Sequence, residues 1–291
     1  MVLVATTVFM FAMAVVFAVA LGVANRRLAV EVDPRQAEIE SILPGINCGG
    51  CGFAGCGGYA EALVKGQAEA NRCGPGGPTL AGKIARILGV DVGETWPRLP
   101  VVHCCAGQDV RPPRPIRLRI TTCASAHVAG QTQACAYGCL GLGDCRSACR
   151  YGAIEMVNGL PVIRYDLCTS CGACQRACPR GIIRLIPFKA EQMTVVACNS
   201  HDPGATMRQL KICSVGCIGC GLCARTNADL FKMSTNLAVI DYQKDDTLVD
   251  LAPVAAKCPV KVIRTVGPDD STPVRPEPPA KTEPVATQTT A

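Results

Sequence analysis

The sequence predicts an α+β chain in which one membrane-spanning helix precedes three small cysteine-rich units. Three observations predict this organisation: an uncharged N-terminal stretch, 21 cysteines found mostly in short runs, and a second copy of part of the cysteine pattern. Aromatic residues make up only 4% of the 291 residues. Large side chains therefore cannot organise most of the interior, and the length suits two or three small domains.

The N-terminal stretch from Val2 to Ala24 carries no charge and is long enough for a helix that spans the hydrocarbon core of a membrane. Asn25-Arg26-Arg27 follow at once. A cleavable signal peptide, the alternative, would begin with basic residues before its apolar region. We expect a retained single-pass transmembrane anchor over residues 1–27, with the arginine pair keeping the following domains on the cytoplasmic side.

The first cysteine unit is expected over residues 31–100. Asp33-Pro34 predicts the N-cap and first turn of a short helix that stops at Pro44. Further helices are expected from about Tyr59 to Ala70 and from Thr79 to Val90. Between them lie four cysteines with the spacing C-x2-C-x4-C-x16-C: Cys48, Cys51, Cys56 and Cys73. Four soft thiolates among glycines allow the backbone to wrap closely around an iron–sulfur cluster.

The central unit, expected over residues 135–188, contains the run Cys168-x2-Cys171-x2-Cys174-x3-Cys178-Pro179. Two-cluster ferredoxins bind [4Fe–4S] clusters with this spacing, and the fourth Cys of each run ligates the other cluster. A looser run precedes it: Cys135, Cys139, Cys145 and Cys149. Asn158-Gly159 between the two runs predicts a two-residue hairpin turn. The unit therefore resembles a bacterial ferredoxin.

A second ferredoxin-like module is expected over residues 189–266. Its segment Gly216 to Asn227 aligns without gaps over Gly138 to Cys149. The first copy has Leu142 in place of the second Cys of the run, and the second copy has Asn227 in place of the fourth. Each copy is followed by a turn dipeptide, then by Cys-Pro and an apolar strand, which indicates two ferredoxin-like modules in tandem.

The four-Cys spacing of the first unit and the resemblance of the two modules to two-cluster ferredoxins together imply about four [4Fe–4S] clusters and their ligands. One cluster of the first module lacks a ligand at Leu142, and we assign Cys135 to it, with Cys123 as the alternative. The second module has ligands for one cluster only. The expected ligands are Cys48, Cys51, Cys56, Cys73, Cys135, Cys139, Cys145, Cys149, Cys168, Cys171, Cys174, Cys178, Cys217, Cys220, Cys223 and Cys258.

Five cysteines remain outside these sets: Cys104, Cys105, Cys123, Cys198 and Cys213. Four of them could build a fifth cluster site, or all could be free buried thiols, and their spacing leaves both interpretations open. Residues 101–134 are expected to form a connector whose arginines lie on a solvated surface. Residues 267–291 are rich in Pro and Thr, and a disordered tail is expected there.

The composition restricts the function classes. Only three His are available, so thiolate-bound iron is expected, with all-Cys zinc as the alternative. The formal charge of +6 would usually suggest a nucleic-acid partner. Each oxidised cluster with four thiolates carries about −2, so no nucleic acid is expected as a partner. The sequence offers no hydrolytic triad, phosphate loop or paired carboxylates, and one-electron transfer is the expected chemistry.

An anchor, a C-x2-C-x4-C-x16-C domain and two ferredoxin-like modules, in this order, resemble the B subunit of the Rnf complex over residues 1 to about 266. The resemblance implies an electron-transfer subunit, without a complete active site of its own, of an ion-translocating ferredoxin:NAD oxidoreductase in the prokaryotic inner membrane. Its implied partners are soluble ferredoxin and the other membrane and peripheral subunits. Alternatives are a membrane-tethered ferredoxin serving another oxidoreductase and an all-Cys zinc interaction protein.

Overall fold

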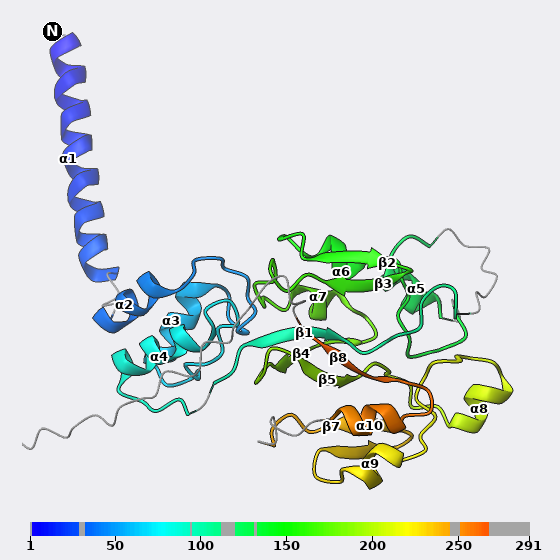
Figure 1. Ribbon diagram of the computed structural model, residues 1–291. Helices are drawn as coiled ribbons and strands as arrows, with labels where there is room; N and C mark the ends of the chain where they lie inside the picture. Colours follow the sequence, from blue (N-terminus) through cyan, green and yellow to red (C-terminus); the bar gives the residue numbers. More distant parts are fainter. Residues whose placement is uncertain are drawn as a thin grey trace, which may run out of the picture.

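The computed structural model describes residues 2–28, 33–93, 95–111, 120–130, 133–244 and 251–267. Within these ranges a long helix is followed by a domain of three helices and by two modules, each built from two two-stranded antiparallel sheets. In Figure 1 the helix α1 stands away from the rest, the helical domain lies at its base, and the modules follow beyond it. The expected α+β class and the order of the units are confirmed.

Helix α1 (Val2–Leu28) is long and apolar enough to cross a membrane. Its stretch Val4–Arg27 has a mean hydropathy of 2.5, and its most apolar part is not buried within the protein. A core helix of a soluble domain would bury its apolar face instead. Arg26 and Arg27 lie in the last turn, where cations are favoured by the helix dipole.

The helical domain consists of α2 (Pro34–Ile42), α3 (Cys56–Val64) and α4 (Gly77–Leu88). As expected, Asp33 caps α2: its carboxylate accepts the Arg35 backbone N–H at 2.9 Å. Helix α3 is shorter than predicted, because Gly66 adopts a left-handed conformation at φ 68° directly after its last turn. The apolar faces of the three helices share one core, which includes Ile39, Tyr59, Leu63, Leu80 and Ile84.

The first ferredoxin-like module pairs β1 (Arg98–Val102) with β4 (Ile183–Pro187) and β2 (Ile154–Val157) with β3 (Leu160–Ile163). Asn158 and Gly159 connect β2 to β3 with φ values of 49° and 68°, so the predicted hairpin is confirmed. Its helices are α5 (Cys123–Ala129), α6 (Asp144–Ser147) and α7 (Ala173–Ala177). Strand β1, which completes the sheet with β4, lies well before residue 135.

The second module repeats the arrangement. Strand β5 (Met193–Val196) pairs with β8 (Ile263–Val266), and β6 (Phe231–Ser234) pairs with β7 (Leu237–Ile240). Its helices are α8 (Gly204–Gln209), α9 (Leu222–Thr226) and α10 (Ala252–Lys257). Strand β8 begins later than expected, because Cys258 to Lys261 form a turn in which the Lys261 N–H donates to the Cys258 carbonyl at 3.1 Å.

The two modules are joined side by side along β1–β4 and β5–β8 (Figure 1). One buried apolar cluster contains Leu99 and Val101 from β1 together with Val195 from β5. Directly after β1, the buried ring of His103 contacts the Val196 carbonyl through Nδ1 at 2.9 Å. The tail after Gly267 and residues 112–119 of the expected connector lie outside the described residues.

Candidate metal centres

The four cysteines of the helical domain line one cavity, which we call site 1: Cys48, Cys51, Cys56 and Cys73. The loop before α3 shapes it, since Asn47 accepts the Cys56 backbone N–H at 2.8 Å and the Gly50 N–H donates to the Cys48 sulfur at 3.4 Å. Burial raises the pKa of the Cys73 thiol, and the neighbouring thiols raise it further. Such thiols become thiolates when a metal cation replaces their protons.

A second group, site 2, brings together Cys149, Cys168, Cys171 and Cys174. Burial raises the pKa of the Cys174 thiol to about 11, and Cys168, Cys171 and Cys149 are near enough to raise it as well. Cys149 comes from the end of α6, whereas the other three come from the run that leads into α7. This is the exchange of the fourth ligand that is typical of two-cluster ferredoxins.

Sites 1 and 2 lie next to each other, because the helical domain is fitted closely against the first module. The Arg176 guanidinium donates to the Cys48 carbonyl and to the Cys171 carbonyl, both at 3.2 Å. Gly50 also lies at this contact: a Cβ at that position would stand only 2.7 Å from the Cys171 carbonyl oxygen. One arginine therefore holds the backbones of ligands from both sites.

A third cavity, site 3, is lined by Cys139, Cys145 and Cys178, and the fourth thiol in its lining is Cys123. Asp144 explains how a residue so far upstream in the sequence arrives there. Its carboxylate accepts the backbone N–H groups of Cys123 at 2.8 Å and Ala124 at 3.0 Å, which fixes the start of α5 against α6.

Cys135, which we expected to complete site 3, does not line that cavity and lies near Cys104 and Cys213 instead. The geometry therefore favours the alternative ligand, Cys123. A sequence signal for it exists: Thr122 accepts the Ser125 N–H at 3.1 Å and caps a helix that begins at Cys123.

Site 4 is the cavity of the second module, and its thiols are Cys217, Cys220, Cys223 and Cys258. Sites 2, 3 and 4 share one backbone feature, a left-handed glycine directly before a helix. Gly172, Gly143 and Gly221 precede α7, α6 and α9 with φ values of 70°, 84° and 67°, a left-handed conformation that glycine adopts at no steric cost. Each glycine turns the chain so that a ligand cysteine enters the first turn of the helix.

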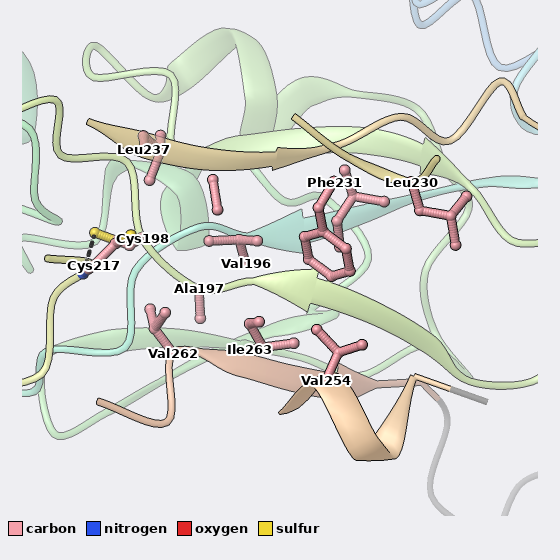
Figure 2. Packing of buried hydrophobic residues seen from close by; sticks show 12 residues of the cluster. Val196, Ala197, Cys198, Cys217, Leu230, Phe231, Leu237, Val254, Val262 and Ile263 are labelled. Carbon is pink, nitrogen blue, oxygen red and sulfur yellow. Dashed lines mark hydrogen bonds between the residues drawn. The ribbon is translucent and has the colours of Figure 1, made fainter. Parts of the chain in front are cut away.

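The second module was expected to have ligands for one cluster only, and in its described residues apolar side chains fill the interior. Asn227, in place of a fourth Cys, uses its side-chain oxygen to accept the Leu230 N–H at 3.1 Å. Figure 2 shows the apolar cluster of this module, in which Phe231 of β6, Val254 of α10 and Val196 of β5 are buried together. Apolar packing here contributes what a second cluster contributes in the first module.

The thiols of sites 1, 3 and 4 are arranged around cavities. Within the described ranges, no three His, Cys, Asp or Glu side chains are close enough together to hold a single metal ion. Four thiolates around one zinc ion would stand about 3.8 Å apart, given Zn–S bonds of roughly 2.3 Å in a tetrahedron. Thiols arranged around a cavity match a [4Fe–4S] cluster, in which each thiolate binds a different iron.

Arg111, expected on a solvated surface, is half-buried beside site 3. Its guanidinium donates to the Cys139 carbonyl and, at 2.9 Å, to the Gly159 carbonyl. The expectation was wrong for this arginine, because the hairpin turn and the cysteine loop present carbonyl oxygens that need a donor.

Three family models match the chain. An Fe-S cluster family matches residues 43–75, a 4Fe-4S binding domain matches residues 161–184, and a 4Fe-4S single cluster domain of ferredoxin I matches residues 214–265. These matches fall on site 1, on the run of site 2 and on site 4. The chain therefore carries [4Fe–4S] binding domains.

Similar proteins extend the match over most of the chain. The B subunit of the Na(+)-translocating ferredoxin:NAD(+) oxidoreductase complex of Acetobacterium woodii is 34% identical, over 85% of this chain and 73% of that protein. The B subunit of the proton-translocating ferredoxin:NAD(+) oxidoreductase complex of Clostridium ljungdahlii is 39% identical, over 89% and 91%. The B subunit of the ion-translocating oxidoreductase complex of Methanosarcina acetivorans is 35% identical, over 84% and 91%.

These relatives are components of multi-subunit complexes, and their similarity covers 84 to 89% of this chain. The apolar helix α1 together with this kinship indicates a membrane-anchored protein. The chain belongs to the family of B subunits of the Rnf-type ion-translocating oxidoreductase complexes, in which it is an iron–sulfur electron-transfer component.

Proposed function

We propose that this protein accepts electrons from reduced ferredoxin and passes them along its thiolate sites to the other subunits of the complex. The observation that carries the proposal is the sequence of contacts between neighbouring sites. Arg176 bridges the backbones of sites 1 and 2. Sites 2 and 3 meet where α6 packs on α7, with Cys174 near enough to Cys145 to affect its thiol.

The clusters supply one-electron chemistry, and the chain supplies their spacing and surroundings. Tunnelling slows steeply with distance, so neighbouring sites that share an arginine or a helix pair suit a relay. The names of two relatives include ferredoxin and NAD, and those names differ in the translocated ion. The proposal that ferredoxin is the electron donor to this chain is supported by the similarity to these relatives and by the neighbouring thiolate sites.

The proposed ligands follow the cavities of sites 1, 3 and 4 and the thiol group of site 2, with Cys123 in site 3. We propose the following domains: an anchor over residues 2–28, a helical domain up to about residue 97, a first module from Arg98 to about residue 188, and a second module from about residue 189 to Gly267. The proposed ligands are Cys48, Cys51, Cys56 and Cys73; Cys149, Cys168, Cys171 and Cys174; Cys123, Cys139, Cys145 and Cys178; and Cys217, Cys220, Cys223 and Cys258.

Reduced ferredoxin should reduce the holoprotein directly. When anaerobically prepared full-length protein in detergent is mixed with photoreduced ferredoxin, the visible absorbance of its oxidised clusters should bleach within the mixing experiment. Oxidised ferredoxin is the control and should cause no bleaching. If a strong chemical reductant bleaches the clusters but reduced ferredoxin does not, ferredoxin is not the electron donor to this protein.

The iron–sulfur domains should lie on the cytoplasmic side, because Arg26 and Arg27 end the apolar helix and basic residues are retained in the cytoplasm. In inverted inner-membrane vesicles that contain the full chain, added trypsin should degrade both modules. In right-side-out vesicles the same treatment should leave them intact until detergent is added. Digestion of the modules in right-side-out vesicles but not in inverted vesicles would indicate the opposite orientation.

A further inference from the structure

Two pairs of cysteines meet at the junction of the modules, outside sites 1 to 4. Each module contributes an equivalent pair. Cys104 follows β1 as Cys198 follows β5, and Cys135 precedes Cys139 by the same interval as Cys213 precedes Cys217. Even the backbone beside them repeats: the His103 N–H donates to Ile182 at 2.7 Å, and the Ala197 N–H donates to Val262 at 2.8 Å.

The sulfurs of Cys104 and Cys198 each accept a backbone N–H from the first ligand of a neighbouring site. The Cys139 N–H donates to the Cys104 sulfur at 3.5 Å, and the Cys217 N–H donates to the Cys198 sulfur at 3.3 Å (Figure 2). The Ser200 N–H adds a second donor to Cys198 at 3.4 Å. Hydrogen bonds of this kind stabilise a thiolate and are a usual feature of cluster ligands.

The four thiols are close together and largely withdrawn from solvent. Cys135 and Cys198 are buried, and Cys104 and Cys213 are half-buried. Burial raises the pKa of Cys135, and the nearby thiols of Cys104 and Cys213 raise it further. Burial raises the pKa of Cys198 to about 12, with Cys135 among the neighbouring thiols that add to the increase.

One buried donor beside these thiols has no hydrogen-bond partner within the described residues: Nε of Arg180. Arg180 also donates through Nη1 to the carbonyls of Cys135 and Gly138, at 2.8 and 3.0 Å. A half-buried cation among thiols is costly unless negative charge accompanies it. An anionic cluster with its sulfide acceptors would supply that charge.

Cys105 is close by but its surroundings differ. Its thiol donates to the Val215 carbonyl at 3.7 Å, and among the described hydrogen bonds no backbone N–H of a proposed ligand is directed to its sulfur. This contrast makes Cys105 a matched control for its neighbour Cys104.

We propose that Cys104, Cys135, Cys198 and Cys213 bind a fifth [4Fe–4S] cluster between the two modules, a bridging site that connects site 3 to site 4. The inference deepens the proposed function and rests on it for the electron source. One electron passes from the neighbouring reduced cluster, which is thereby oxidised by one unit, to the bridging cluster, which is reduced by one unit. No bond is formed or broken, and no proton is transferred.

The bridging site can be tested by counting iron and acid-labile sulfide in the anaerobically reconstituted full chain. Five sites predict about 20 irons and 20 sulfides per chain, since each cluster holds four of each. Cys198→Ala and Cys213→Ala should each lower both counts by about four, and the double variant should lose no more than either. Cys105→Ala should retain the full count.

About 16 irons in the wild-type chain, or one zinc or one sulfide-free iron at the junction, would overturn the bridging site. The electron paramagnetic resonance signal of site 4 should persist in Cys198→Ala, which shows that the second module has folded. The iron count and the reaction with ferredoxin together distinguish failure of the bridging site from failure of the proposed function. A 16-iron protein that ferredoxin reduces retains the proposed function alone, whereas a 20-iron protein that ferredoxin does not reduce retains the bridging site alone.

Discussion

Cys123→Ala is expected to remove the cluster of site 3, with the loss of about four irons and four sulfides per chain. The thiol lines the same cavity as Cys139, Cys145 and Cys178, and Asp144 fixes its backbone in place. Three thiolates are a poor replacement for four, because the fourth iron is then exposed to solvent and to loss. The measurement is iron and sulfide analysis after anaerobic reconstitution, with Cys105→Ala as the matched control.

A rescue variant makes this prediction specific. Leu142 occupies the position that Cys220 holds in the second module, where Cys220 lines the cavity of site 4. The Leu142 side chain is 40% exposed, so its replacement costs little core packing. Cys123→Ala combined with Leu142→Cys should therefore restore the lost irons. A full iron count in Cys123→Ala alone would exclude Cys123 as a ligand.

The competing assignment of Cys135 to site 3 gives a different additive pattern. If Cys123 and Cys135 serve different sites, the double variant Cys123→Ala/Cys135→Ala should lose about eight irons, since independent sites add. If both serve one site, the double variant should lose only about four. The count therefore decides between the two assignments without any knowledge of which spectroscopic signal belongs to which cluster.

The sequence alone predicted those features that depend on residues close together in the chain. The left-handed dipeptide Asn158-Gly159 determines its hairpin, Asp33-Pro34 starts a helix, and the C-x2-C runs of sites 1 and 4 line their own cavities. The choice between Cys135 and Cys123 is not local. Spacing favoured Cys135 because it lies four residues before Cys139, whereas Cys123 reaches site 3 only through the Asp144 carboxylate, a contact across 21 residues.

The junction of the modules shows the same limit. The internal repeat indicated that Cys104 matches Cys198 and that Cys135 matches Cys213, but a repeat does not say how its two copies pack. Only the pairing of β1 with β4 and β5 with β8, and the shared apolar cluster around Val101 and Val195, bring the two pairs together. Such a site cannot be recognised from the spacing within one module, because each module contributes only two of the four thiols.

Arg180→Gln is expected to lower the reduction potential of site 3. Arg180 follows Cys178-Pro179 where the second module has Val260 after Cys258-Pro259, so only the first module carries a cation here. The guanidinium is near the site 3 thiols of Cys139 and Cys178, and also near Cys135 of the bridging site. Reduction adds negative charge to a cluster, and a nearby cation stabilises the reduced state more than the oxidised one. Removing it therefore shifts the potential in the negative direction.

The size of this shift follows from a unit charge several ångströms from the cluster at an effective dielectric constant near 20. After allowance for partial exposure, that interaction is about 1–2 kcal/mol, or roughly 40–90 mV for a one-electron couple. An anaerobic redox titration followed by electron paramagnetic resonance would measure it. Arg180→Lys keeps the charge and should retain most of the potential, and Arg86→Gln, on the exposed face of α4, should cause no shift. A positive shift in Arg180→Gln, or equal shifts in the Lys and Gln variants, would show that the charge of Arg180 does not set the potential of site 3.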